Sequence, residues 1–144
     1  MPFEIIKHLW LGDSKDAEHV TLDTKLVVNC THDLPFSTED VTQIRIPVND
    51  INDDREFAIM LNHWNSGLFL CIRDHITRGQ DVLVHCHMGR QRSAATVAAF
   101  LMNNGNTKDD AINYIKSKKR DAFFPNANFD GALNMFAVRL EKAV

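Results

Sequence analysis

Hydrophobic residues in the first half of the chain gather in short clusters that polar residues and turn formers interrupt. The clusters lie at residues 4–6, 8–11, 25–30 and 43–48, and another lies at residues 82–84. Apolar runs of this length, bounded by Gly, Asp or Pro, are typical of short or buried strands. We therefore predict a strand at each of these five places.

Helical spacing replaces this pattern elsewhere. From residue 55 to residue 78 the apolar residues recur at the spacing of one helix face: Phe57, Met60, Leu61, Trp64, Leu68, Cys71, Ile72 and Ile76. Gly67 lies where this stretch is expected to kink or to divide into two helices. Further helices are predicted at residues 14–19 with Ser14 as cap, 92–104, 107–118 with a capping box at Thr107, and 129 to the end. The predicted strands come first and are mixed with helices, and helices dominate the second half of the chain. This order indicates an α/β sandwich with a central sheet.

Length, charge and cysteine content narrow the class of protein. The chain has 144 residues, 44% of them hydrophobic, which is enough for one domain spanning residues 1–144. A net charge of -3 offers no general attraction for nucleic acid or for a membrane surface. The three cysteines are few and odd in number, which favours reduced thiols. With no signal peptide and no apolar run long enough to span a membrane, we expect a cytoplasmic, monomeric protein.

The most informative segment follows the last apolar cluster. The order is His85, Cys86, a loop of five residues, Arg92 and Ser93, and then an alanine-rich helical pattern. A loop that opens a helix offers backbone N–H groups and the positive end of the helix dipole to an anion. The same field stabilises a thiolate at Cys86, which makes that residue a candidate nucleophile. The predicted phosphate-binding residues are those of the loop itself: His87, Met88, Gly89, Arg90, Gln91 and Arg92.

This segment resembles the HCxxGxxRS loop of protein tyrosine phosphatases, in particular of the dual-specificity branch. The likeness extends over most of the chain. Leu9-Trp10-Leu11-Gly12 is similar to the opening hairpin of that branch, and Ile46-Pro47-Val48-Asn49-Asp50 to its general-acid loop. Residues 124–129 resemble its Pro-Asn-x-Gly-Phe turn, with Asn128 in place of glycine. Residues 89–95 and 118–125 are most similar to phosphatases of large DNA viruses, which would place the protein in an infected cell or a virion.

The resemblance implies both a fold and a mechanism. The fold is a mixed, mostly parallel sheet of about five strands flanked by helices. Cys86 attacks phosphorus to form a phosphocysteine, Arg92 holds the phosphoryl oxygens, and Asp50 acts as general acid. Ser93 assists the sulfur, while His85 and Asn126 support the loop. No cofactor and no metal is expected, and the substrate is a phosphoprotein with phosphotyrosine and also phosphoserine or phosphothreonine.

Several alternatives stay open. The segment between Asp50 and Cys86 is a few residues longer than is usual for the family, so Asp54 and then Asp53 are second and third candidates for the general acid. The chain could instead be a phosphoprotein-binding pseudophosphatase, or act on RNA 5′ ends or phosphoinositides. It could also act through the basic run at residues 116–120. Cys30 ends a strand that the resemblance puts beside the loop, which predicts a Cys30–Cys86 disulfide on oxidation.

Overall fold

A five-stranded sheet organises the protein, and the computed structural model describes residues 1–143. The strand order is β1-β2-β5-β3-β4. Strand β1 pairs antiparallel with β2, and all other neighbours are parallel, as the family resemblance implies. The strands are β1 (Phe3–Ile6), β2 (Leu9–Gly12), β3 (Thr24–Asn29), β4 (Thr42–Arg45) and β5 (Asp81–His85).

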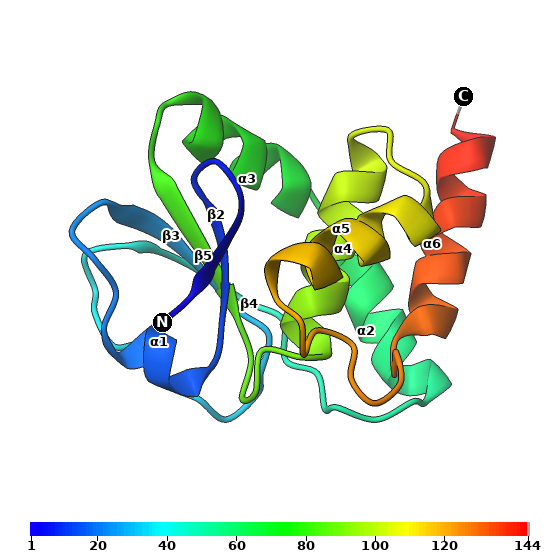
Figure 1. Cartoon of the computed structure of the whole chain (residues 1–144), viewed down its shortest axis with the longest axis horizontal. Helices are drawn as coiled ribbons and strands as arrows, with labels where there is room; N and C mark the ends of the chain where they lie inside the picture. The colour runs from blue at the N-terminus through cyan, green and yellow to red at the C-terminus, as the bar shows by residue number, and fades with distance from the viewer. Residues whose placement is uncertain (144) are drawn as a thin grey trace.

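Helices cover both faces of this sheet. Figure 1 shows α2, α4, α5 and α6 together on one side, with α1 on the other. The predicted long helix is divided at Gly67, whose φ of 89° suits a residue without a side chain. The helices are α1 (Ser14–Glu18), α2 (Asp54–Trp64), α3 (Leu68–Thr77), α4 (Arg92–Asn103), α5 (Lys108–Lys118) and α6 (Asp130–Lys142).

Helix α4 lies at the centre of the core, with every residue from Arg92 to Met102 buried. The sheet presents fully buried leucine and valine side chains of β2 and β5 to it. Phe69 of α3 packs edge-on against Phe100 of α4 and Phe136 of α6, with ring centroids 5.8 Å apart in both pairs. Because α4 is held from all sides, its N-terminus is a fixed point at the end of β5.

Two details of the helices and strands differ from the prediction, and a third agrees with it in part. Asp13, and not Ser14, caps α1, because its carboxylate accepts from the backbone N–H groups of Lys15 and Asp16. Strand β4 ends at Arg45 instead of Val48, since Pro47 has no N–H for a sheet ladder. Thr107 caps α5 by accepting from the N–H of Asp110, which is one half of the predicted box.

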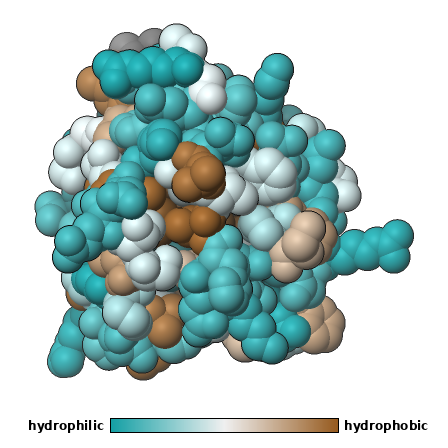
Figure 2. Space-filling view, turned by 90° about the vertical axis from the view of Figure 1, so that its left-hand side faces the viewer, coloured by the Kyte–Doolittle hydropathy of each residue, from teal (hydrophilic) through white to brown (hydrophobic). Residues whose placement is uncertain are grey.

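The surface on the side of α1 is mostly hydrophilic, with small apolar areas near the centre of the view (Figure 2). Within residues 1–143, no helix combines the length and the apolar character that crossing a membrane requires.

Candidate active site

The carboxyl ends of the parallel strands meet at one edge of the sheet. Gly12 of β2 and Asn29 of β3 both pair in register with His85, the last residue of β5. Cys86 follows His85 directly, so the loop that it begins leaves the sheet at the centre of this edge. In open α/β sheets this edge is where ligands bind.

The loop curls tightly between Cys86 and α4. Gly89 has a φ of 69°, and a Cβ atom at this position would lie 2.8 Å from the carbonyl oxygen of Gly12. The carbonyl of His87 accepts a hydrogen bond of 3.0 Å from the backbone N–H of Ser14. The β2–α1 turn therefore supports the loop from outside and leaves no space for a side chain at Gly89.

Replacing Gly89 by alanine is expected to disturb the loop and reduce activity. The substitution combines a left-handed backbone with a clash against main-chain atoms, so we expect a loss of stability of ~1–3 kcal/mol. Urea unfolding of the variant measures this loss, and alanine at Gly105 is the matched control. Gly105 also has a positive φ, but a Cβ there meets nothing within 4 Å. Equal stability losses in the two variants would contradict the close approach.

Cys86 and Ser93 face each other across the loop. The Cys86 side chain is buried, and its Sγ lies 3.0 Å from the Ser93 Oγ. When Cys86 is a thiolate, it has no proton to share, so the Ser93 hydroxyl is the donor. Ser93 is the second residue of α4, whose N-terminus adds its dipole to this stabilisation.

Arg92 is buried beneath the same loop. Its Nη1 donates to the carbonyl oxygen of Val48 at 3.0 Å. Its Nε is buried and has no hydrogen-bond partner within residues 1–143. A buried guanidinium N–H without a protein partner is costly unless a ligand accepts from it. The contact with Val48 thus fixes the orientation of the guanidinium group. Its Nε–H remains as a donor for the planar pair of oxygens of an anion.

The three candidate aspartates have different surroundings. The Asp50 Oδ1 accepts from the Asn128 Nδ2 at 2.9 Å. Asp53 is the N-cap of α2, with its carboxylate 2.7 Å from the backbone N of Arg55, and Asp54 is the first helical residue. Capping and favourable interaction with the helix dipole account for Asp53 and Asp54. Asp50 is exposed and lies two residues after Val48, whose carbonyl accepts from Arg92. Of the three aspartates, it is therefore the one whose segment contacts the site.

Comparisons with known proteins agree with this geometry. The family pattern described as "Dual specificity phosphatase, catalytic domain" matches residues 9–139. Protein 123R of Invertebrate iridescent virus 6 is 36% identical, covering 94% of this chain and 91% of that protein. The chain belongs to the dual-specificity phosphatase family.

Human dual specificity protein phosphatase 7 is 30% identical over 92% of this chain, which spans 32% of that longer protein. The crystal structure of a mouse dual specificity phosphatase complexed with zinc tungstate superposes with a TM-score of 0.83 and 27% identity. It covers 99% of this chain and 89% of the mouse chain.

His85 of this phosphatase is buried and neutral. Burial lowers the pKa of its imidazole to about 4, and its Nδ1 has no hydrogen-bond partner within the described residues. The ring therefore carries no charge at neutral pH and adds no cation to the field around Cys86. Its role in supporting the loop stays a prediction.

Gln91 points away from the anion-binding face of the loop. Its Nε2 donates to the carbonyl oxygens of Phe124 at 3.1 Å and Asn126 at 2.7 Å, and its Oε1 accepts from the backbone N–H of Asn128 at 2.9 Å. The predicted brace at Asn126 is thus made through its backbone carbonyl, while the Asn126 side chain is exposed. The side chain that braces the turn belongs to Gln91.

The outer rim of the loop carries paired charges. The Nε2 of His87 lies 2.9 Å from the Oδ1 of Asp33, and this hydrogen bond lowers the pKa of Asp33. Arg90 binds Asp121 at 3.1 Å, and Asp121 also pairs with Lys119. Burial alone would raise the pKa of Asp121, but these two cations outweigh it and lower the pKa. Lys119 is itself buried, so the basic run at residues 116–120 is not a uniformly exposed cluster.

Cys30 lies deep beside the site. Its thiol donates to the Thr96 Oγ1 at 3.6 Å. Burial, together with the charge of nearby Cys86, raises the pKa of Cys30 to about 12. Cys30 is therefore a protonated thiol, and all three cysteines are free. The Cys30–Cys86 disulfide under oxidation stays a prediction.

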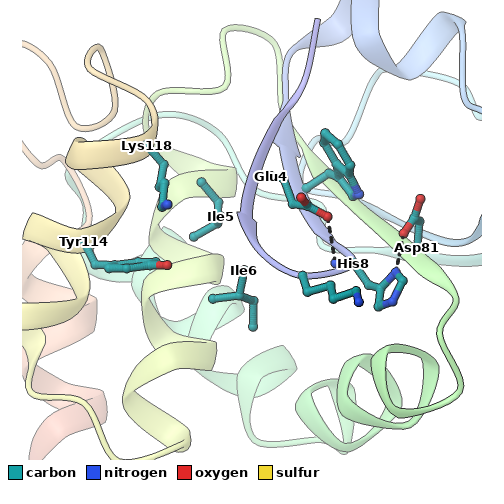
Figure 3. A pocket seen from close by; sticks show the side chains of 9 residues that line it. Glu4, Ile5, Ile6, His8, Asp81, Tyr114 and Lys118 are labelled. Atoms are coloured by element: carbon teal, nitrogen blue, oxygen red, sulfur yellow. Dashed lines mark hydrogen bonds and ion pairs between the residues drawn. The ribbon is translucent and has the colours of Figure 1, made fainter.

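No group of His, Cys, Asp and Glu side chains within residues 1–143 is arranged to hold a metal ion. A separate hollow of about 510 Å³ lies between the β1–β2 hairpin and α5 (Figure 3). His8 joins Asp81 there at 2.8 Å, with Tyr114 and Lys118 of α5 on the opposite wall. None of the loop residues from Cys86 to Ser93 lines it, so it is not part of the catalytic site.

Proposed function

We propose that this phosphatase hydrolyses phosphotyrosine, and also phosphoserine and phosphothreonine, through a phosphocysteine at Cys86. The observation that carries the proposal is the constellation around one helix end. The Cys86 Sγ lies 3.0 Å from the Ser93 Oγ, in a loop that also buries the Arg92 guanidinium with its Nε unpaired. A nucleophile and a planar cation at a helix N-terminus provide what phosphoryl transfer requires.

In the first step the Cys86 thiolate attacks phosphorus. The P–S bond forms as the bond from phosphorus to the substrate oxygen breaks. Arg92 and the loop N–H groups of residues 87–92 bind the remaining phosphoryl oxygens, whose charge they stabilise in the transition state. Asp50 gives its proton to the leaving oxygen, so that the side-chain hydroxyl of the dephosphorylated protein departs neutral.

In the second step a water molecule attacks the phosphocysteine. Asp50, now a carboxylate, accepts the proton from that water as the P–O bond forms and the P–S bond breaks. The sulfur leaves as a thiolate, and the Ser93 hydroxyl donates to it across the 3.0 Å contact. Phosphate departs, and both Cys86 and Asp50 return to their starting states.

The charges of the rim favour a phosphoprotein over a polyphosphorylated substrate. Arg90, the cation of the loop that faces outward, is paired with Asp121. His87 is paired with Asp33. Both side chains are therefore engaged with carboxylates, and the Asp33 carboxylate adds negative charge to the rim, which disfavours a substrate that carries several phosphates. A pseudophosphatase would lack part of the machinery, whereas Cys86, Arg92 and Asp50 are all present.

Hydrolysis of phosphotyrosine and phosphothreonine peptides with EDTA present tests this proposal, and three aspartate variants identify the acid. We expect Asp50→Ala to slow peptide hydrolysis by about 10²–10³-fold, the usual contribution of a general acid, and Asp54→Ala to leave it unchanged. Asp53→Ala should keep turnover but lose ~1 kcal/mol of stability with its helix cap. Turnover that needs a metal, or a larger loss in Asp54→Ala than in Asp50→Ala, would contradict the proposal.

A further inference from the structure

The carboxyl of Asp50 has one side-chain partner that lies far away in the sequence. Asn128 donates from its Nδ2 to the Asp50 Oδ1 at 2.9 Å. Asn128 follows the turn before α6, whereas Asp50 lies on the segment between β4 and α2. The sequence pattern of the family has glycine at the place of Asn128, and glycine has no side chain to make this contact.

The backbone of Asn128 is itself fixed from the phosphate loop. Its N–H donates to the Gln91 Oε1 at 2.9 Å, and the Gln91 amide also binds the carbonyls of Phe124 and Asn126. Gln91 is buried and lies immediately before Arg92. The buried glutamine therefore places the whole turn, and with it the Asn128 side chain, relative to the loop that holds the substrate phosphate.

Arg92, which follows Gln91, makes a second connection to the segment that carries Asp50. Arg92 donates to the carbonyl oxygen of Val48, two positions before Asp50. Arg92 thus holds the backbone of the segment that carries Asp50, and Asn128 holds the Asp50 carboxyl. Gln91 in turn holds Asn128. Two adjacent residues of the loop fix the distance between the phosphorus site and the proton donor.

We propose that Asn128 is a positioning residue that orients the Asp50 carboxyl toward the leaving oxygen, with Gln91 holding Asn128 in place. Asp50 is exposed, so without a partner its carboxyl would rotate freely between several orientations. A hydrogen bond to one oxygen leaves the other oxygen to carry the proton that is transferred. The inference rests on the proposed function, because it assigns Asn128 to the proton-transfer step of that reaction.

This role makes the effect of Asn128 depend on the leaving group. p-Nitrophenol leaves without protonation, whereas the tyrosine of a phosphotyrosine peptide leaves faster when protonated. Replacing Asn128 by alanine is therefore expected to lower kcat/KM on the peptide by about five-fold, the size expected for one hydrogen bond to the uncharged, protonated carboxyl group. The kcat/KM on p-nitrophenyl phosphate, which covers only the first step, and inhibition by orthovanadate, which fills the phosphate loop, should be unchanged.

The test compares four proteins on both substrates: wild type, Asn128→Ala, Asp50→Ala and the double variant. Asn128→Ala should add no further loss in the Asp50→Ala background, since it acts through that carboxyl. Asn128→Gln, which retains an amide donor, should recover part of the rate. Thermal unfolding of each variant shows whether the fold is intact.

A loss of equal size in kcat/KM on both substrates, or a loss that persists in the Asp50→Ala background, would overturn the positioning role. Wild-type protein that hydrolyses neither substrate would overturn the proposed function and this inference together. Wild-type turnover that vanishes in Cys86→Ser, combined with an Asn128→Ala variant as active as wild type on the peptide, would overturn this inference alone.

Discussion

Serine at position 86 is expected to abolish turnover on every phosphomonoester. The side chain of Cys86 is buried in the loop, and its sulfur lies beside the Ser93 hydroxyl near the N-terminus of α4, two features that favour a negative charge. A serine hydroxyl stays protonated there and is a far weaker nucleophile, since no general base lies beside it. We expect a loss on the order of 10⁵-fold in kcat, as for removal of the nucleophile in other enzymes that form covalent intermediates.

Binding separates this result from unfolding. Cys86→Ser should still bind a phosphotyrosine peptide, because Arg92 and the loop N–H groups are unchanged. Cys71→Ser is the matched control. Cys71 lies on α3, where its Sγ is 3.8 Å from the His75 Nδ1, and its loss should leave kcat at the wild-type level. Residual activity of Cys86→Ser above a few per cent of wild type would require a different nucleophile.

Lysine at position 92 is expected to lower kcat by about 10²–10³-fold. Arg92 uses Nη1 to reach the Val48 carbonyl, and its Nε has no partner within residues 1–143, so the proposed mechanism assigns that Nε to the phosphoryl group. Lysine carries the same charge but has a single nitrogen, so it cannot hold Val48 and a planar pair of oxygens at once. The variant therefore loses both the transition-state contact and the connection to the Asp50 segment.

Steady-state kinetics on p-nitrophenyl phosphate measures this effect, and its kcat/KM does so without the contribution of Asp50, because kcat/KM covers only the first step and p-nitrophenol leaves unprotonated. Arg73→Lys is the control, because Arg73 lies on α3 and binds Asn104 outside the site. Full activity in Arg92→Lys would mean that charge alone suffices and that the bidentate geometry is not used.

Much of this architecture follows from the sequence. Alternating and buried apolar clusters predict all five strands, and the order of Cys86, Arg92 and Ser93 after β5 predicts the site at the carboxyl edge of the sheet. Gly67 predicts the break between α2 and α3. These features are local, since each depends on residues close together in the chain.

The contacts that the sequence does not predict are those between distant segments. Gln91 braces residues 124–128, Asn128 reaches Asp50, and the Val48 carbonyl holds Arg92. A carbonyl acceptor leaves no trace in the residue type, so the sequence predicts Asn126 as a support of the loop but not that its backbone makes the contact. One signal existed for Asn128, because an amide stands where the family pattern has glycine.

The measurement that tests the central claim most directly is capture of the covalent intermediate. Asp50→Ala mixed with p-nitrophenyl phosphate should form the phosphocysteine without an acid, and then break it down slowly for lack of a base. After an acid quench and proteolysis, mass spectrometry should find one phosphoryl group on the peptide that contains Cys86. A phosphoryl group on another residue, or turnover with no modified peptide at any time, would contradict the mechanism.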